Sequence, residues 1–136
     1  MEIDAPTLSA ADAQACRDFV ADLPATLGGE DQVETTGDTA YGAAWGDPAI
    51  VLTCGVGVPD EFNQGSACLL VSKVGWFVPP EQEADQDADV LLTAVGYSPR
   101  ISLLVPADDR GSTSAAALAD LAGPVKRGLD LTNDCL

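Results

Sequence analysis

The chain has 136 residues, 46% of them hydrophobic, and its 22 acidic residues against 6 basic ones give a net charge of −16. A chain of this length buries one core but seldom two, so we expect a single domain over residues 1–136. The negative field repels phosphate backbones and anionic lipids, which argues against nucleic-acid binding and electrostatic membrane docking. No apolar run approaches the ~20 residues that cross a bilayer, so direct membrane insertion by this segment is not expected.

The first predicted element is a helix that begins near residue 10 and ends before Pro24. Ser9 is placed to cap it, and Asp12 follows three residues later, as in a capping box. Apolar side chains then recur at helical spacing, at Cys16, Phe19, Val20 and Leu23. The pattern predicts an amphipathic helix with one buried face.

The middle of the chain predicts short strands. Runs of strand-like composition occur at Gln32–Thr36, Ile50–Cys54, Ala67–Val71 and Val74–Val78. The last of these either continues the run before it or pairs with it around Gly75. The small residues of Gly37–Ala44 predict turn and irregular structure.

The clearest strand pair comes later. Val90–Val95 and Arg100–Val105 flank Gly96–Pro99, which predicts a β-hairpin with a four-residue loop. The two runs are apolar, as expected of buried strands.

The last predicted element is a helix that begins near Ser112–Ser114. One face carries Leu118, Leu121, Ala122 and Val125, and Gly123-Pro124 is expected to kink or split the helix. Taken together, the elements predict an α+β fold. We expect a two-layer sandwich, with a mostly antiparallel sheet of four or five strands and the N- and C-terminal helices packed on one face.

The chain has 4 cysteines and no histidine. No C-x-x-C spacing occurs, so the cysteines indicate two disulfides and an oxidising compartment rather than a metal site; free thiols in a cytosolic protein are the alternative. We expect Cys54–Cys68, joining two adjacent strands, together with Cys16–Cys135. The main alternative pairing is Cys16–Cys54.

The absence of histidine excludes the common Ser or Cys triads and HExxH zinc sites. No nucleotide-binding motif occurs, and no cofactor is predicted. Asp85, Asp87 and Asp89 have the spacing of the first calcium-loop ligands, but Val90 and Gly96 stand where that loop requires glycine and glutamate. We expect a solvated acidic loop, with weak divalent-cation binding as the alternative.

The two tryptophans stand out in a chain with only 5% aromatic residues. Trp45 and Trp76 lie in glycine-flanked segments and, with Tyr41 and Tyr97, are candidates for a ligand-binding platform, with Asp47 beside Trp45 as a candidate polar contact. Packing of the same rings in the core is the favoured alternative, because burying a large ring stabilises a small domain.

Tyr41-Gly-Ala-Ala-Trp45-Gly-Asp47-Pro-Ala-Ile50-Val-Leu-Thr-Cys54-Gly55 resembles the signature of an uncharacterised family of actinobacterial exported or membrane-anchored proteins. Gly75-Trp76-Phe77 and Thr93-Ala94-Val95-Gly96 resemble its later blocks, and Cys16 and Cys135 fall where that family tends to have cysteines. The resemblance implies an extracytoplasmic domain without the leader or anchor that members typically carry. It brings no activity, cofactor or catalytic residue.

The function that these features favour is a non-enzymatic cell-envelope module that binds a protein or cell-wall component. One alternative is a carboxylate-dependent enzyme acting on envelope glycans, with Asp47 as its candidate acid. The other is a structural protein that responds to divalent cations through its acidic loop.

Overall fold

The computed structural model describes residues 1–63 and 65–133 of the chain. Its helices are α1 (Ala10–Ala21), α2 (Pro80–Ala84) and α3 (Ser112–Gly128), with short 3-10 helices at Thr39–Tyr41 and Ala107–Asp109. Its strands are β1 (Glu2–Ile3), β2 (Thr26–Leu27), β3 (Glu30–Val33), β4 (Thr36–Gly37), β5 (Gly42–Trp45), β6 (Ile50–Cys54), β7 (Cys68–Val71), β8 (Val74–Phe77), β9 (Val90–Thr93), β10 (Tyr97–Ser98), β11 (Ile101–Val105) and β12 (Asp130–Leu131).

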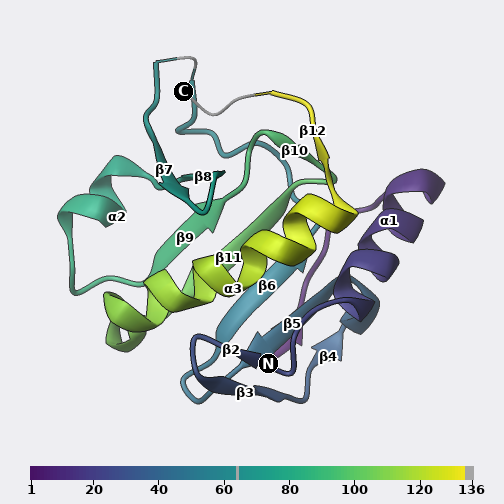
Figure 1. Cartoon of the computed structure of the whole chain (residues 1–136), viewed down its shortest axis with the longest axis horizontal. Coiled ribbons are helices and arrows are strands. Elements are labelled where there is room, and N and C mark those ends of the chain that lie inside the picture. Colours follow the sequence, from purple (N-terminus) through teal and green to yellow (C-terminus); the bar gives the residue numbers. More distant parts are fainter. Residues whose placement is uncertain (64, 134–136) are drawn as a thin grey trace.

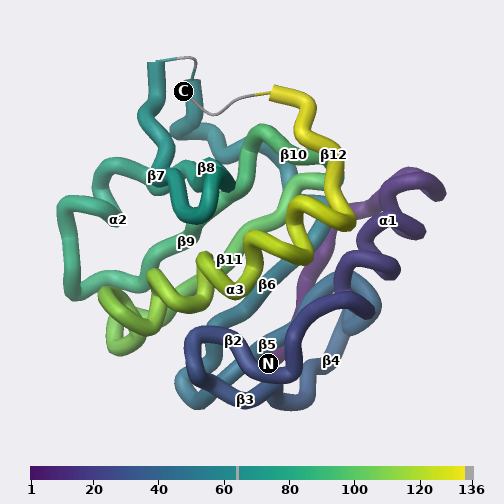
Figure 2. Tube along the Cα trace, viewed as in Figure 1, coloured from purple at the N-terminus to yellow at the C-terminus, as the bar shows by residue number. Residues whose placement is uncertain are grey.

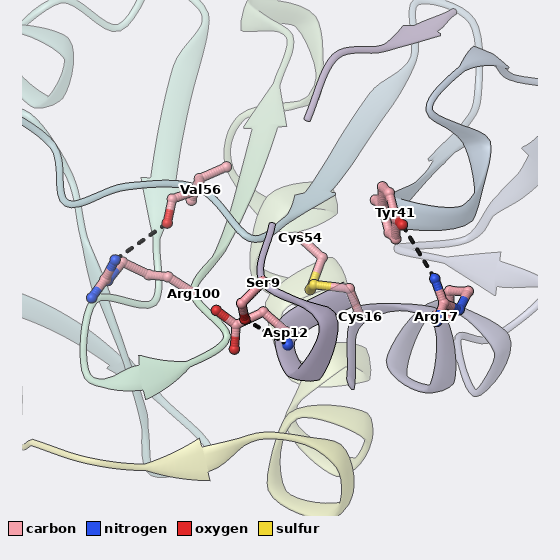
Figure 3. The surroundings of a disulfide bond; sticks show 8 residues. All are labelled: Ser9, Asp12, Cys16, Arg17, Tyr41, Cys54, Val56 and Arg100. Carbon is pink, nitrogen blue, oxygen red and sulfur yellow. Dashed lines mark hydrogen bonds between the residues drawn. A yellow bond between two sulfur atoms is a disulfide. The ribbon is translucent and has the colours of Figure 1, made fainter. Parts of the chain in front are cut away.

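Helix α1 begins where its capping residue predicts. The Ser9 hydroxyl accepts a hydrogen bond from the backbone N–H of Asp12 at 3.1 Å, which satisfies one of the donors left free at a helix start (Figure 3). Cys16 and Phe19 of α1 are buried. The predicted N-terminal helix and its cap are therefore confirmed.

The main sheet has eight strands in the order β2-β3-β5-β6-β11-β9-β8-β7. Every pairing described within it is antiparallel. The α+β class and the mostly antiparallel sheet are confirmed, but the predicted four or five strands are too few. Strand β5 was missed because Gly-Ala-Ala-Trp has little intrinsic strand preference and is a strand through its pairing with β3 and β6.

The predicted late hairpin is present as β9 and β11, paired from Ser102 opposite Thr93 to Val105 opposite Val90. The segment that connects β9 to β11 is not the simple four-residue loop that was predicted. It contains β10, which pairs with β12 near the end of the described chain. The hairpin therefore also anchors the residues that follow α3.

Helix α3 runs without a break from Ser112 to Gly128, so the predicted split at Gly123-Pro124 is wrong. An internal proline removes one helical hydrogen bond and costs ~3 kcal/mol. The buried face of α3, which includes Leu118, Leu121 and Val125, continues on both sides of Pro124. Packing of that face on the core maintains a helix that local preference alone interrupts.

Helices α1 and α3 contact each other and cover the same face of the sheet, as Figures 1 and 2 show. Their buried residues join those of the central strands in the larger core cluster, with Phe19, Leu121, Trp45 and Leu52 among its members. Among the described helices, none is both long and apolar enough to cross a membrane.

The other face of the sheet is covered locally by the N-terminal strand β1. Ile3 packs there with Ala44, Ala49 and Val51 in a second, smaller cluster. Gly42 lies beneath it, and a Cβ at this position would lie 2.5 Å from the Leu52 carbonyl oxygen and 2.7 Å from Ile3 Cγ2. The small residues of β5 therefore permit this close approach.

A disulfide joins Cys16 of α1 to Cys54 of β6, with 5.7 Å between the two Cα atoms (Figure 3). This is the alternative pairing, and the expected Cys54–Cys68 and Cys16–Cys135 bonds are wrong. The error was to take β6 and β7 as neighbours. They are separated by β11, β9 and β8, a distance of roughly four strand spacings or about 19 Å, far beyond disulfide reach. Cys68 is itself disulfide-bonded, and Cys135 lies outside the described residues.

Candidate functional site: an apolar pocket at a sheet edge

Strands β7 and β8 form a hairpin at one end of the main sheet. Within residues 1–63 and 65–133, β7 is the terminal strand of that sheet and pairs with β8 alone. The connection is Ser72-Lys73, with φ angles of 50° and 71°, so the chain turns there and not at Gly75, which lies within β8. Two predicted strands are confirmed, but their arrangement was not apparent from the sequence.

The terminal strand leaves two leucines in contact with solvent. Leu69 is 49% exposed and Leu70 is 60% exposed. Leu69 stands opposite Trp76 and Leu70 opposite Gly75, so the two side chains lie on opposite faces of the sheet. Gly75 offers no side chain to cover Leu70. An apolar sheet edge is a surface that proteins usually protect, which makes this one a candidate for contact with a partner.

A pocket of ≈ 530 Å³ lies beside this edge, between β7, α2 and the first turns of α3, the elements on the left of Figure 1. Leu69 and Val71 of β7, Val90 and Leu92 of β9, and Leu118 of α3 supply apolar lining. Its polar lining residues include Glu83, Gln86, Arg110 and Ser114. Apolar walls with a few polar groups are typical of ligand-binding pockets.

Arg110 holds the acidic segment beside the pocket in place. Its Nη1 donates to the backbone carbonyl oxygens of Asp85 at 2.7 Å and Ala88 at 2.8 Å. On the other side, Gln82 Oε1 accepts a hydrogen bond from the Leu91 N–H at 2.8 Å. We call residues 81–89 the acidic rim. Its carboxylates are all exposed, at Glu81, Glu83, Asp85, Asp87 and Asp89.

The three aspartates predicted as weak calcium ligands do not converge. Asp85 Oδ1 accepts from the Asp87 N–H at 3.1 Å, and Asp89 Oδ1 accepts from the Ala107 N–H at 3.0 Å. The Asp85 carboxylate stabilises a turn within the rim, and the Asp89 carboxylate connects the rim to the 3-10 helix at Ala107–Asp109. Across residues 1–63 and 65–133, no three acidic, cysteine or histidine side chains gather closely enough to hold a metal ion.

The structure does not assemble the predicted aromatic platform. Trp45 and Trp76 are both fully buried, and Tyr97 is buried as well. The tryptophans belong to β5 and β8, which are four strand positions apart, or roughly 19 Å. Both rings pack in the core cluster, as the favoured alternative expects.

The other two predicted binding residues lie elsewhere. Tyr41 is half-buried, and its hydroxyl accepts a hydrogen bond from Arg17 at 3.2 Å (Figure 3). Asp47 is exposed and lines a separate pocket of ≈ 440 Å³ with Asp89 and Asp108. Neither residue borders the pocket at the β7 edge.

Sequence reasoning missed the residues that form the apolar pocket. Ala67–Val71 was recognised as a strand, but its place at the end of the sheet depends on distant pairings. One local signal was present. The consecutive Leu69-Leu70 puts an apolar residue on each face of one strand.

The fold and pocket define a disulfide-linked α+β protein with a largely apolar pocket beside a sheet edge. A family model described as a protein of unknown function, DUF3515, matches residues 1–133. The chain therefore belongs to the DUF3515 family. Comparison with curated proteins found no match, and comparison with solved structures also found none.

Proposed function

We propose that this chain is a single-domain, non-enzymatic binding module of the cell envelope, and that it binds its partner at the apolar pocket beside β7. The observation that carries the proposal is the ≈ 530 Å³ pocket lined in part by Leu69, which is 49% exposed. Binding of a partner there would remove this apolar surface from water.

The composition of the pocket favours binding over hydrolysis. Paired-carboxylate hydrolysis needs two acids across one cleft. Among the described residues that line the pocket, Glu83 is the one carboxylate. The chain also has no histidine to act as a base.

Two observations support a location outside the cytoplasm. The Cys16–Cys54 disulfide and the disulfide-bonded state of Cys68 are typical of oxidising compartments. The resemblance around Trp45 to Gly55 is to exported or membrane-anchored actinobacterial proteins. We therefore include the envelope in the proposal.

Site-specific photocrosslinking in the cells that produce the protein tests it. A photoreactive benzoylphenylalanine at position 69, on the rim of the pocket, is compared with the same residue at position 131. Leu131 is similarly exposed, at 60%, but lies on β12 away from the pocket. We expect an adduct from position 69 in the envelope fraction and none from position 131.

The same experiment has clear contrary results. No adduct from position 69, or the same adduct from both positions, would contradict a specific binding site at the pocket. An adduct formed with a cytosolic partner would contradict the envelope location.

A further inference from the structure

We infer that the ligand is an extended peptide segment of the partner, which adds as a further strand at Leu69–Val71, along the edge of β7 that faces away from β8. In this arrangement an apolar side chain of the peptide enters the pocket, and a neighbouring Lys or Arg contacts the acidic rim. The inference rests on the proposed function, because it specifies what the same pocket binds.

The backbone of β7 has hydrogen-bonding groups that face away from β8. Val71 and Val74 close the two-residue turn, and the pair that closes such a turn exchanges both hydrogen bonds across the hairpin. Bonded and non-bonded pairs alternate along antiparallel strands. Leu70, one residue before Val71, therefore directs its N–H and C=O to the open edge, where an incoming strand binds.

The side-chain pattern matches the backbone pattern. Leu69 and Val71 point to the helix face of the sheet and line the pocket, whereas Leu70 points to the opposite face. A strand added beside β7 alternates its side chains in the same way. Every second side chain of the peptide then lies over the pocket, which gives side-chain specificity beside backbone pairing.

Charge identifies the kind of peptide. Glu83 of the acidic rim lines the pocket, and Glu81 and Asp85 are exposed beside it in the chain. Arg110, which also lines the pocket, is bonded to the backbone of the rim itself. A basic residue in the ligand complements this surface. A second copy of the chain fits poorly, because pairing β7 with β7 brings two such rims together on molecules that each carry a charge of −16.

The probe is a phage-displayed library of random dodecapeptides selected on the folded, disulfide-bonded protein. We expect the enriched sequences to alternate apolar residues and to contain Lys or Arg. The best peptide is then synthesised with a fluorophore, and its affinity is measured by fluorescence anisotropy. Leu70→Pro should weaken binding at least tenfold, because it removes the outward N–H, whereas Leu70→Ala keeps that N–H and should weaken binding less than threefold.

Proline is tolerated in an edge strand where its nitrogen faces solvent, so Leu70→Pro should keep the circular dichroism spectrum of the parent. If it unfolds, N-methylation of the peptide supplies the same test. Two peptides are compared, one methylated on its odd-numbered backbone amides and one on its even-numbered amides. One of them should lose binding and the other should keep it, because only every second amide faces β7. Equal loss of binding in the two methylated peptides would overturn strand addition.

Ala115→Trp separates this inference from the proposed function. Ala115 is exposed and lines the pocket, so a ring at this position should fill the pocket and weaken peptide binding. A peptide that is sensitive to Ala115→Trp but binds Leu70→Pro normally would overturn strand addition and leave the pocket as the binding site. If no peptide is enriched, the inference that the ligand is a peptide is overturned. The proposed function would still be tested separately by photocrosslinking at position 69.

Two further results bear on the occupant. Replacing Glu81 and Glu83 together by glutamine should weaken a Lys-containing peptide several-fold, and no change would overturn the basic specificity. A dimer in sedimentation equilibrium that Leu70→Pro dissociates would show that a second copy occupies the edge, which would also overturn the inference.

Discussion

At the scale of single residues, the two buried tryptophans differ in one hydrogen bond. Trp45 Nε1 donates to the Pro24 carbonyl oxygen at 3.1 Å, whereas Trp76 Nε1 is buried with no partner among the described residues. Replacing either ring by phenylalanine leaves a similar cavity. Trp45→Phe also loses a hydrogen bond, so it should lower the free energy of unfolding by about 1 kcal/mol more than Trp76→Phe.

Urea unfolding of the two variants, followed by far-ultraviolet circular dichroism, measures the difference. Each variant serves as the control for the other, because both parent rings are fully buried. If the two variants lost equal free energy of unfolding, or if Trp76→Phe lost more, the predicted stabilisation by the Trp45 hydrogen bond would be wrong.

At the scale of elements, the β7–β8 turn places two residues in a backbone region that suits glycine and asparagine. Ser72 and Lys73 both have positive φ angles, which costs ~1 kcal/mol or more for each residue with a Cβ. The combined change Ser72→Asn and Lys73→Gly supplies the residues that this turn prefers. We expect an increase of about 1 kcal/mol in the free energy of unfolding, or about 3 °C in Tm.

Thermal unfolding measures the change, with Lys73→Ala as the control. The control separates the effect of the positive φ angle from the effect of removing the lysine charge. This control removes the same positive charge but keeps a Cβ, so it should give no increase. A gain of equal size in Lys73→Ala would assign the effect to something other than the φ angle.

At the scale of the whole molecule, the Cys16–Cys54 bond ties α1 to the centre of the sheet across a sequence separation of 38 residues. On the chain-entropy model, closing a loop of this size stabilises the fold by about 4 kcal/mol. The double variant Cys16→Ala, Cys54→Ala should lose about that amount in urea unfolding. A loss below about 1 kcal/mol would contradict the model for this bond.

Peptide mapping tests the connectivity directly. Trypsin alone does not cleave between Cys54 and Cys68, because no Lys or Arg lies between them, but Glu61 allows a second cut with a glutamate-specific protease. Unreduced digests should contain a peptide of Cys16 linked to a peptide of Cys54. A Cys54–Cys68 peptide would contradict the fold described here.

The sequence by itself determined the elements whose pattern is local. Helix α1 follows from the Ser9 cap and the spacing of Cys16 and Phe19, and the β9–β11 hairpin follows from two apolar runs around Gly96–Pro99. Such signals depend on residues within a few positions of one another. The α+β class follows from those elements in turn.

The tertiary structure decided what depends on strand order. It made a strand of Gly42–Trp45 and separated β6 from β7. It also paired Cys16 with Cys54 and placed Leu69 of β7 in a pocket beside α2 and α3. Pairing between strands joins residues far apart in the chain, and its free energy comes from packing and burial that no short window of sequence contains. The disulfide and the pocket were therefore beyond local reasoning, because both are products of which strands become neighbours.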